Sequence, residues 1–384
     1  MRIAYIPGAF FPDPGGAQVQ VHNLANIFNK KNFNIDVLLL NKTNIKNHNY
    51  NILYLNKLIV NFVFYFDYYL KIDLTFLLVF YLSRVIKLKK YNAWHFIFLN
   101  YKSLLLIKSL KKLNQNIIVT FQGADIQINK KIFYGNRLDL KYDLLLKKIL
   151  PMVNIFTAIS KNIYLDLIKL GVNKNLIFSI PNGIPLNKFI KIKKEIIKKK
   201  TSKIRLITVA RYAEKKKGFD LIPKFLKQLV KSQIEFEWTI IGKNTSKLLE
   251  NNEIYKLKKK FNIYENFFIN NESLFPSKKI ISKYLEADVY INLSRIESFG
   301  ITFIEALSSN LPVISFDTKG ANEIVINNYN GFIIKNNQVI KFVKKIEKLT
   351  KNKSFFKSKP LKSAKKYDFE NLKKEYFKLY QVDL

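Results

Sequence analysis

Short apolar strands alternate with helical patterns in both halves of the chain, and this alternation restricts the fold more than any other feature. Residues 2–6 form an apolar run, and a helical pattern over residues 19–28 follows it after a turn. Residues 204–210 and 289–293 form similar runs in the second half. Strands that alternate with helices are typical of parallel α/β sheets. Because 384 residues exceed the usual size of one core, we expect two doubly wound α/β domains rather than a barrel.

A lysine-rich segment separates the two halves. Residues 188–202 are strongly charged and show no strong hydrophobic periodicity. We therefore expect one domain over residues 1–188 and a second over residues 189–368. Hydrophobic residues make up 48% of the chain, which is enough to supply both cores.

The most informative loop follows the strand at residues 289–293 and leads into a helical pattern that ends near Asn310. It therefore lies at the carboxyl end of a strand, where parallel α/β sheets bind their ligands. The N–H groups around Gly300, Ile301 and Thr302 would point at an anion, and the helix dipole favours a diphosphate there. Asn310 is suited to a left-handed helix cap, because Asn adopts that conformation more readily than most residues.

Two carboxylates flank this helix start. Glu297 precedes the helix and Glu305 lies inside it, eight residues later. Two glutamates at this spacing mean little alone, and a solvated helix residue is the simplest interpretation of Glu305. Their position at a loop-to-helix junction suits a nucleotide-sugar.

Two other strand ends carry residues suited to phosphate. Gly15 and Gly16 follow the first strand, where two missing Cβ atoms let the backbone approach a phosphate. Arg211 follows the strand at residues 204–210, and Lys217 comes six residues later. Taken alone, Gly-Gly is more often a turn and a lysine run is often a solvated loop.

These landmarks together resemble the retaining glycosyltransferase family 4. Its hallmark is a Ser-x-x-Glu-x-Phe-Gly-x-x-x-x-Glu-Ala segment followed by a Pro-Val-Ile strand, and residues 294–306 and 312–314 match it. The resemblance implies that Glu297 contacts the transferred sugar and that Glu305 binds the ribose hydroxyls. It further implies that Arg211 and Lys217 hold the diphosphate. The other donor-binding residues that it implies are Gly15, Gly16, Phe299, Gly300, Ile301 and Thr302.

A weaker match lies at the end of another strand. Residues 119–125 resemble the family's Thr-x-His-Gly-x-Asp segment, but Gln122 stands at the histidine position. The resemblance places Gln122 on the acceptor side and Asp125 among the catalytic residues, with Glu297, Arg211 and Lys217. A glutamine can donate a hydrogen bond to a hydroxyl but cannot exchange a proton near neutral pH, so we do not expect a general base at this position.

The resemblance implies a GT-B fold, in which two Rossmann-like domains face a deep cleft and a final helix, about residues 369–384, returns to the first domain. It implies a retaining, hexosyltransferase-type enzyme that moves sugar from a nucleoside-diphosphate sugar to a glycan or lipid-linked acceptor in bacterial surface polysaccharide or lipopolysaccharide biosynthesis. We expect no cofactor and no metal, because two fixed cations, Arg211 and Lys217, can neutralise the leaving diphosphate. Another GT-B enzyme, such as a phosphorylase or an epimerase, is the alternative.

The net charge of +38 raises nucleic-acid binding as a second alternative. The charge is dispersed, and no zinc-finger, homeodomain or RNP-like pattern accompanies it. Joint enrichment of Lys, Asn, Ile, Phe and Tyr indicates an AT-rich coding sequence, so we expect no nucleic-acid partner. The absence of cysteine fits a reducing cytoplasm, and we see no classical signal peptide.

Residues 56–90 bear on location. Two strongly apolar runs, residues 58–66 and 76–82, are separated by Asp67, Lys71 and Asp73. Neither run reaches the length of a spanning helix. The runs are either core and crossover helices of the first domain or aromatic helices that lie in a membrane interface facing anionic lipid. The expected location is the cytoplasm, with the inner face of the cell membrane as the site of any attachment.

Overall fold

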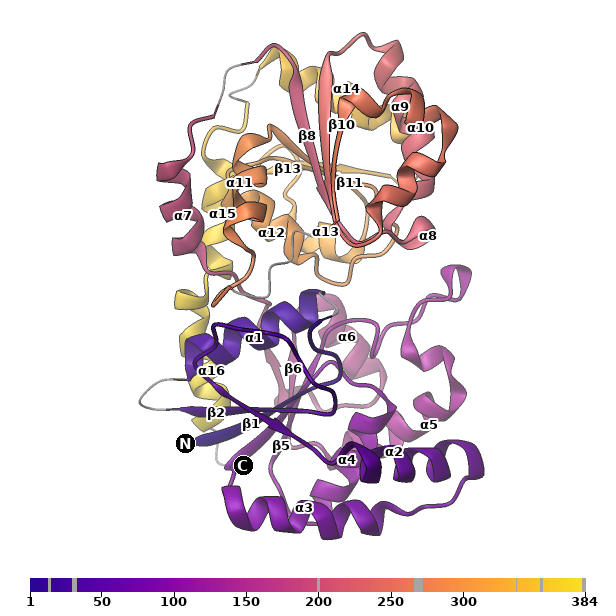
Figure 1. Cartoon of the computed structure of the whole chain (residues 1–384), viewed down its shortest axis with the longest axis vertical. Coiled ribbons are helices and arrows are strands. Elements are labelled where there is room, and N and C mark those ends of the chain that lie inside the picture. The colour runs from indigo at the N-terminus through magenta and orange to yellow at the C-terminus, as the bar shows by residue number, and fades with distance from the viewer. Residues whose placement is uncertain are drawn as a thin grey trace. The chain divides into compact units, whose positions relative to one another are not determined.

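The computed structural model describes residues 1–12, 15–29, 33–198, 201–265, 272–335, 337–352 and 355–381. The chain divides into two compact units (Figure 1). The first unit comprises Met1–Asn182, Asn270–Phe275 and Leu372–Leu384. The second unit comprises Gly183–Ile269 and Pro276–Asn371.

A seven-stranded parallel sheet forms the centre of the first unit, in the order β3-β2-β1-β4-β5-β6-β7. The chain builds outward from β1 to β3 and then returns to start β4 on the other side of β1. This reversal is a topological switch point, which opens a crevice at the carboxyl ends of β1 and β4. The strands are β1 (Arg2–Pro7), β2 (Asn34–Leu39), β3 (Asn51–Tyr54), β4 (Ala93–Ile97), β5 (Ile117–Phe121), β6 (Ile155–Ala158) and β7 (Ile177–Ser179).

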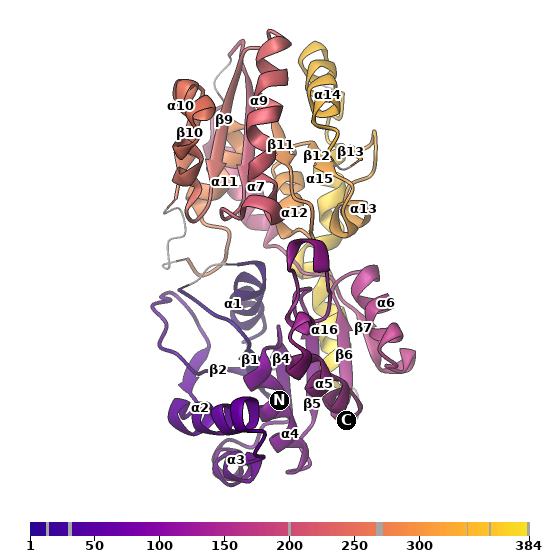
Figure 2. The same ribbon diagram turned by 90° about the vertical axis from the view of Figure 1, so that its right-hand side faces the viewer.

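Helices cover both faces of this sheet, as the doubly wound topology requires (Figure 2). Helices α2 to α5 pack against one another in one layer, while α1 packs on β1 and β2 and contacts α16 through the rings of Phe28 and Tyr376. The helices are α1 (Gly16–Phe28), α2 (Lys57–Tyr65), α3 (Thr75–Lys89), α4 (Tyr101–Lys111), α5 (Leu140–Ile149), α6 (Lys161–Lys169) and α16 (Phe369–Gln381); a π-helical turn, Phe66–Leu70, continues α2.

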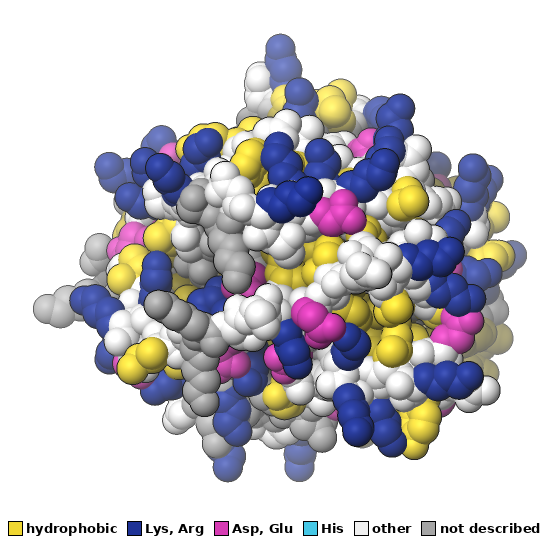
Figure 3. Space-filling model, turned by 90° about the horizontal axis from the view of Figure 1, so that it is seen from above, with side chains coloured by type: hydrophobic (Ala, Val, Ile, Leu, Met, Phe, Trp, Pro, Cys, Tyr) yellow, Lys and Arg dark blue, Asp and Glu magenta, His cyan; other side chains and the backbone are white. Residues whose placement is uncertain are grey.

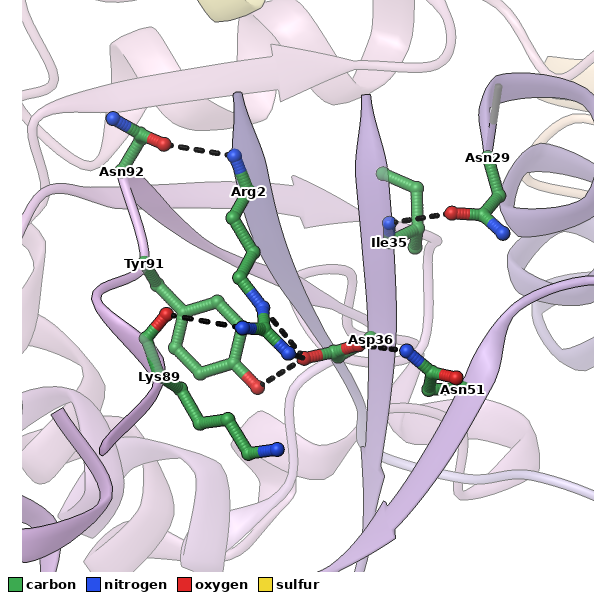
Figure 4. Close-up of polar contacts among 8 residues, drawn as sticks. All are labelled: Arg2, Asn29, Ile35, Asp36, Asn51, Lys89, Tyr91 and Asn92. Atoms are coloured by element: carbon green, nitrogen blue, oxygen red, sulfur yellow. Dashed lines mark hydrogen bonds and ion pairs between the residues drawn. The ribbon is translucent and has the colours of Figure 1, made fainter. Parts of the chain in front are cut away.

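A buried carboxylate ties three strands together near one edge of the sheet (Figure 4). Asp36 on β2 accepts hydrogen bonds from Arg2 on β1 at 2.8 and 3.0 Å, from the Tyr91 hydroxyl at 2.7 Å and from Asn51 on β3 at 2.8 Å. A buried charge is tolerated only when it is paired and hydrogen-bonded, and Asp36 meets both conditions. The network therefore secures the order of β1, β2 and β3.

The second unit repeats the plan with six parallel strands in the order β10-β9-β8-β11-β12-β13. Here the switch point lies between β8 and β11. The strands are β8 (Ile204–Val209), β9 (Phe236–Ile241), β10 (Phe261–Tyr264), β11 (Val289–Asn292), β12 (Val313–Phe316) and β13 (Gly331–Ile334). The helices are α7 (Leu186–Glu195), α8 (Glu214–Lys217), α9 (Ile222–Lys231), α10 (Asn252–Lys256), α11 (Lys278–Glu286), α12 (Ile301–Ser308), α13 (Lys319–Ile324), α14 (Val339–Lys351) and α15 (Lys359–Ala364).

The predicted fold class, two doubly wound Rossmann-like domains, is confirmed by these two sheets. Asn310 has a φ of 60°, the left-handed conformation predicted for it. The expectation of a charged stretch without periodicity over residues 188–202 is wrong in its first part. Residues 186–195 form α7, which buries Leu186, Phe189 and Ile192 on one face. The lysines between them occupy the opposite face and mask the helical period.

On the face shown in Figure 3, Lys and Arg side chains lie scattered among hydrophobic and acidic ones and form no single stripe. None of the described helices is both long enough and apolar enough to cross a membrane.

Candidate active site

Three cations gather in the second unit after β8. Arg211 follows the strand, and α8 then carries Lys216 and Lys217. Gly218 ends this turn with a φ of 70°, and a Cβ atom there would lie 1.9 Å from the carbonyl oxygen of Leu293. Only glycine allows this approach. The lysine turn is thereby held against the loop that follows β11.

Arg295 stabilises the same contact between the lysine turn and the loop that follows β11. Its guanidinium donates to both carboxylate oxygens of Asp220 at 2.7 and 2.8 Å and to the carbonyl of Lys215 at 2.7 Å. Its backbone N–H donates to the carbonyl of Lys216 at 2.9 Å. Bidentate bonds of this kind fix geometry as well as charge. Arg295 therefore positions Lys216 and Lys217, a role that our sequence analysis did not assign to it.

Glu297 interacts with the lysines that Arg295 positions. The Lys217 ammonium forms a short ion pair with Glu297, and the Ser294 hydroxyl donates to the same carboxylate oxygen at 2.9 Å. Burial alone would raise the pKa of Glu297, but the charge and hydrogen bond of Lys217, aided by Lys216 and Ser294, outweigh it and lower the pKa. Glu297 is therefore a fixed anion.

The cations outnumber this carboxylate. Burial, the charge of Lys217 and that of Arg211 lower the pKa of Lys216 to about 8, against the opposing effect of Glu297. Arg211 is exposed, and no carboxylate of the described residues pairs with it. The loop thus retains positive charge that can bind an anion.

The start of α12 lies four residues after Glu297 in the chain. Gly300 precedes it with a φ of 89°, where a Cβ atom would come within 2.5 Å of the Phe303 ring. The N–H groups of Ile301 and Thr302 open the helix, and the first N–H groups of a helix have no partner within it. The Thr302 hydroxyl accepts a hydrogen bond from Tyr290 at 2.8 Å. An anion near Gly300 would therefore meet free backbone donors.

Glu305 lies one helical turn further on and is buried. Its carboxylate accepts a hydrogen bond from the Tyr284 hydroxyl at 2.9 Å. Burial raises the pKa of Glu305 to about 7, although the bond from Tyr284 acts in the opposite direction. A solvated glutamate on a helix would not have a raised pKa. Carboxylates with strongly shifted pKa values are concentrated at functional sites.

Phe299 supports the loop from beneath. Its ring is buried against Tyr367, with ring centroids 5.8 Å apart, so the side chain contributes to the core. A Cβ atom on Gly320 would lie 2.4 Å from the Phe299 carbonyl oxygen, and the Gly320 N–H donates to the Glu297 carbonyl at 2.8 Å. A donor contact of Phe299 remains a prediction for its backbone.

In the first unit, Asp125 organises the loop after β5. Its buried carboxylate accepts hydrogen bonds from the N–H groups of Gln122, Gly123 and Leu99 at 2.8 to 3.1 Å. Burial raises the pKa of Asp125 to about 6, even though these backbone bonds lower it. The geometry gives Asp125 a positioning role, and its catalytic role remains a prediction.

The side-chain amides of Gln122 and Asn182 are hydrogen-bonded to each other. The Gln122 amide donates to Asn182 at 3.2 Å, and the Asn182 amide donates back at 2.9 Å. This pair links the loop after β5 to the end of the first unit. Gln122 is partly buried, and its place on the acceptor side remains a prediction.

The predicted glycine pair lies at the start of α1. Gly15 is the N-cap residue, in extended conformation with no side-chain cap, and Gly16 is the first helical residue. Asp13 and Pro14 of the same predicted turn lie outside the described residues. Gly15 and Gly16 are therefore beside a helix N-terminus, where backbone donors are available to an anion.

The structure places the predicted residues at strand ends of the two sheets. Arg211, Lys217, Glu297, residues 299–302 and Glu305 come from neighbouring loops at the β8/β11 switch point, while Gly15, Gly16, Gln122 and Asp125 follow strands of the first sheet. Tyr284 and Arg295 were missed. An arginine inside the glutamate motif and an aspartate three residues after Lys217 were the available signal for the second. Among the described residues, no group of three His, Cys, Asp or Glu side chains could hold a metal ion.

Two parallel sheets that each carry helices on both faces define the chain as a GT-B glycosyltransferase fold. The family model "Glycosyltransferase Family 4" matches residues 14–188, and the model "Glycosyl transferases group 1" matches residues 189–368. The chain therefore belongs to the family 4 glycosyltransferases of the group 1 type.

Relatives with curated names are bacterial glycosyltransferases. The poly(ribitol-phosphate) alpha-N-acetylglucosaminyltransferase of Staphylococcus aureus is 26% identical over 208 residues, which are 53% of this chain and 40% of that protein. The alpha-monoglucosyldiacylglycerol synthase of Acholeplasma laidlawii is 28% identical over 192 residues, 47% and 46% of the two chains. This chain thus spans less than half the length of these two relatives.

A solved structure matches along the whole chain. The crystal structure of HepE from Anabaena in complex with UDP and glucose has a TM-score of 0.73 at 15% identity and covers 99% of both chains. At this identity the likeness shows the fold.

Proposed function

We propose that this protein transfers a sugar from a nucleoside-diphosphate sugar to a glycan or lipid-linked acceptor with retention of the anomeric configuration, in the synthesis of a bacterial surface glycan. One observation carries the proposal. Lys217 pairs with the fixed carboxylate of Glu297, Lys216 acts on the same carboxylate, and Arg211 lies near Lys216. Glu305 follows in α12. By their names, one relative transfers N-acetylglucosamine to poly(ribitol phosphate) and another synthesises a glucosyldiacylglycerol. HepE was crystallised with UDP and glucose, and these three names support this class of reaction.

Each of these residues binds a different part of the donor. Arg211 and Lys217, with the N–H groups that open α12, bind the diphosphate. The carboxylate of Glu305 accepts hydrogen bonds from the ribose hydroxyls, and Glu297 contacts the transferred sugar while it keeps Lys217 in place. Phosphate bound between fixed cations and a helix N-terminus needs little reorganisation when charge develops on it.

The chemical step follows from these positions. The bond between the anomeric carbon and the leaving phosphate oxygen breaks, and the acceptor oxygen bonds to that carbon on the same face. The acceptor proton passes to the leaving phosphate. The cations stabilise the negative charge that accumulates on the nucleoside diphosphate, so the reaction proceeds without a metal. Undiminished turnover in EDTA, with the anomer of the product read by NMR, tests both features.

The donor assignment is tested by offering the purified chain a panel of UDP- and other NDP-sugars. Thermal stabilisation and slow release of the nucleoside diphosphate should single out one donor. Stabilisation by no nucleotide sugar, together with tight binding of nucleic acid, would favour the alternative of a nucleic-acid-binding protein.

Glu305→Gln should weaken UDP binding by about tenfold. An ionised carboxylate forms stronger hydrogen bonds with hydroxyls than an amide does, by roughly 1 kcal/mol or more. Isothermal calorimetry with UDP measures the change without knowledge of the acceptor. Glu347→Gln on α14, outside the site, is the matched control and should bind UDP like the unaltered protein.

The same interaction should depend on pH. Because the pKa of Glu305 is raised to about 7, its carboxylate is largely protonated below that pH. UDP affinity should therefore rise between about pH 6 and about pH 8, as the carboxylate ionises. UDP also titrates in this range, so the measured quantity is the difference between unaltered protein and Glu305→Gln. Parallel pH profiles in the two proteins would show that Glu305 does not contact the ribose.

A membrane surface is the second element of the proposal. Residues 56–90 were expected to form either core helices or helices that lie on a membrane. Helices α2 and α3 have features of both, because each buries one side in the core and exposes apolar side chains on the other. Val60 and Val63 are fully buried on α2, as are Leu78 and Leu82 on α3. The exposed large side chains of this segment are Leu58, Phe62, Tyr65, Tyr69, Leu70, Ile72, Phe76, Phe80 and Leu88. Basic residues on the same segment suit anionic lipid.

Phe62→Ser, Phe76→Ser and Phe80→Ser combined should reduce binding to vesicles that contain phosphatidylglycerol by at least about tenfold. The three phenylalanines are 49%, 60% and 61% exposed, and the transfer of each from water into the interface is worth about 1.5–3 kcal/mol at full burial. Phe64 is left unchanged because it packs against Tyr68 and Tyr101. Vesicle sedimentation measures the effect, which should weaken as salt rises.

The control variant replaces three exposed residues of the second unit, Val230, Tyr255 and Ile340, with serine. It should bind vesicles like the unaltered protein. Failure of the unaltered protein to bind anionic vesicles at low salt, or equal loss in both triple variants, would contradict attachment through α2 and α3.

A further inference from the structure

A cavity of about 210 Å³ opens at the carboxyl ends of β1 and β2 in the first unit. The loop after β1, the first turn of α2 and the first turn of α4 enclose it. Gly8 permits this enclosure, since a Cβ atom there would lie 1.9 Å from the Phe98 carbonyl oxygen. The Asn100 side chain donates to the Gly8 carbonyl at 2.6 Å and so holds the loop in place. The cavity lies beside the switch point, where parallel α/β sheets bind ligands.

Two lysines supply all the charge that lines this cavity. Lys57 comes from α2 and Lys102 from α4, and no Asp or Glu is among the lining residues. The Lys102 ammonium donates to the Asn61 side chain at 2.6 Å and lies 5.1 Å from the centre of the Phe64 ring. Neither lysine forms an ion pair within the described part of the chain.

Two like charges beside one cavity are unfavourable without a counter-ion. Burial, and then the charge of Lys57, lower the pKa of Lys102. An anion bound between the two ammonium groups would oppose both effects, because it supplies the opposite charge that the lining residues lack. The arrangement therefore fits an anionic ligand better than a neutral one.

The remaining lining defines what kind of anion fits. Asn41, Asn61, Asn100 and Ser103 offer amide and hydroxyl groups, whereas Leu38, Leu55 and Leu106 make other walls apolar. A lysine ammonium is a compact point charge that commonly binds phosphate. A phosphate with a small organic substituent matches a lining that is cationic and polar in one part and apolar in another.

We propose that this cavity binds a phosphate ester group of the acceptor, between Lys57 and Lys102. The inference rests on the proposed function, because it assigns a chemical class to the acceptor of the same reaction. Helix α2 carries Lys57 and Asn61 in the lining and also exposes Leu58 and Phe62. The phosphate belongs either to a lipid headgroup or to a water-soluble phosphate ester, and the arms of the test separate these two sources.

The first arm uses sn-glycerol 3-phosphate as the probe and calorimetry on the full chain. The combined variant Lys57→Gln and Lys102→Gln should lose about tenfold or more in affinity, since charge-assisted hydrogen bonds to phosphate are lost. Lys148→Gln combined with Lys169→Gln removes the same charge from exposed positions of α5 and α6 and should bind like the unaltered protein. Equal loss in the two double variants would overturn the proposal, because it would show an effect of net charge alone.

Asn61→Asp gives a second measurement in which both lysines remain. The new carboxylate would lie at hydrogen-bond distance from Lys102 and form an ion pair with it. The Lys102 ammonium would then be less able to bind the phosphate. This variant is nearly isosteric, and the added ion pair should keep or raise thermal stability. Phosphate affinity should nevertheless fall by about tenfold. Unchanged affinity in Asn61→Asp would place the probe elsewhere.

The second arm identifies the source of the phosphate. If the site holds a lipid headgroup, sn-glycerol 3-phosphate should compete with vesicles that contain phosphatidylglycerol. If the site holds a water-soluble phosphate ester, sn-glycerol 3-phosphate should bind and leave vesicle binding unchanged. UDP titration runs beside both arms. UDP binding without any binding of glycerol phosphate would overturn this inference and leave the proposed function intact, whereas absent UDP binding would count against the proposed function alone.

Discussion

Arg211→Ala is expected to lower kcat by about two orders of magnitude or more while the protein stays folded. Removal of a fixed group that stabilises charge in a transition state costs about this much in other enzymes. Arg211 is exposed and has no carboxylate partner among the described residues, so its loss leaves no buried charge unpaired. The donor that emerges from the nucleotide-sugar screen serves as substrate, and kcat and KM are measured separately.

Lys215→Ala is the matched control for this variant. Lys215 lies in the same turn and carries the same charge, but its side chain is exposed and only its carbonyl takes part in the contact with Arg295. Its turnover should stay within about twofold of the unaltered protein, as for an ordinary surface residue. Equal turnover in Arg211→Ala and Lys215→Ala would remove Arg211 from the diphosphate site.

Glu297→Gln is expected to lower kcat by about one to two orders of magnitude. The substitution keeps the shape of the side chain but removes the charge that pairs with Lys217. Lys217 then has no fixed position next to Lys216, and the mutual repulsion of the two ammonium groups favours disorder of the turn. The sugar contact proposed for Glu297 is weakened in the same variant.

A double-mutant cycle with Lys217→Met distinguishes these contributions. If Glu297 acts partly through Lys217, the double variant should lose less than the sum of the single losses, with a coupling energy of about 0.5–3 kcal/mol. Thermal unfolding of each variant accompanies the kinetics, because an unpaired buried charge also destabilises the fold. Strictly additive losses in kcat would show that the ion pair has no part in positioning the cation.

Much of this site could be predicted because its residues are close together in sequence. Residues 294–306 contain the loop, the helix start and both carboxylates, and the neighbouring apolar runs indicate which strand ends carry them. The periodicity of those runs also predicts the doubly wound sheets, since burial on both faces leaves a continuous apolar strand.

Contacts between distant segments could not be predicted in this way. Arg295 and Asp220 are 75 residues apart, and their places in the two motifs do not by themselves show that they pair. Helix α7 was missed because its lysines hide a three-residue apolar stripe. The environment of Glu305 was also out of reach, since its raised pKa depends on burial beside Tyr284, which belongs to another helix.

The sequence by itself determined the class of fold, the family and the strand ends that carry charge, because hydrophobic period and short motifs are local properties of the chain. Only the tertiary structure decided which charged groups meet: Lys217 with Glu297 in the second unit, and Lys57 with Lys102 in the first. The physical reason is that an electrostatic interaction depends on distance and burial, and a parallel sheet brings the ends of strands together irrespective of how far apart they are in the chain.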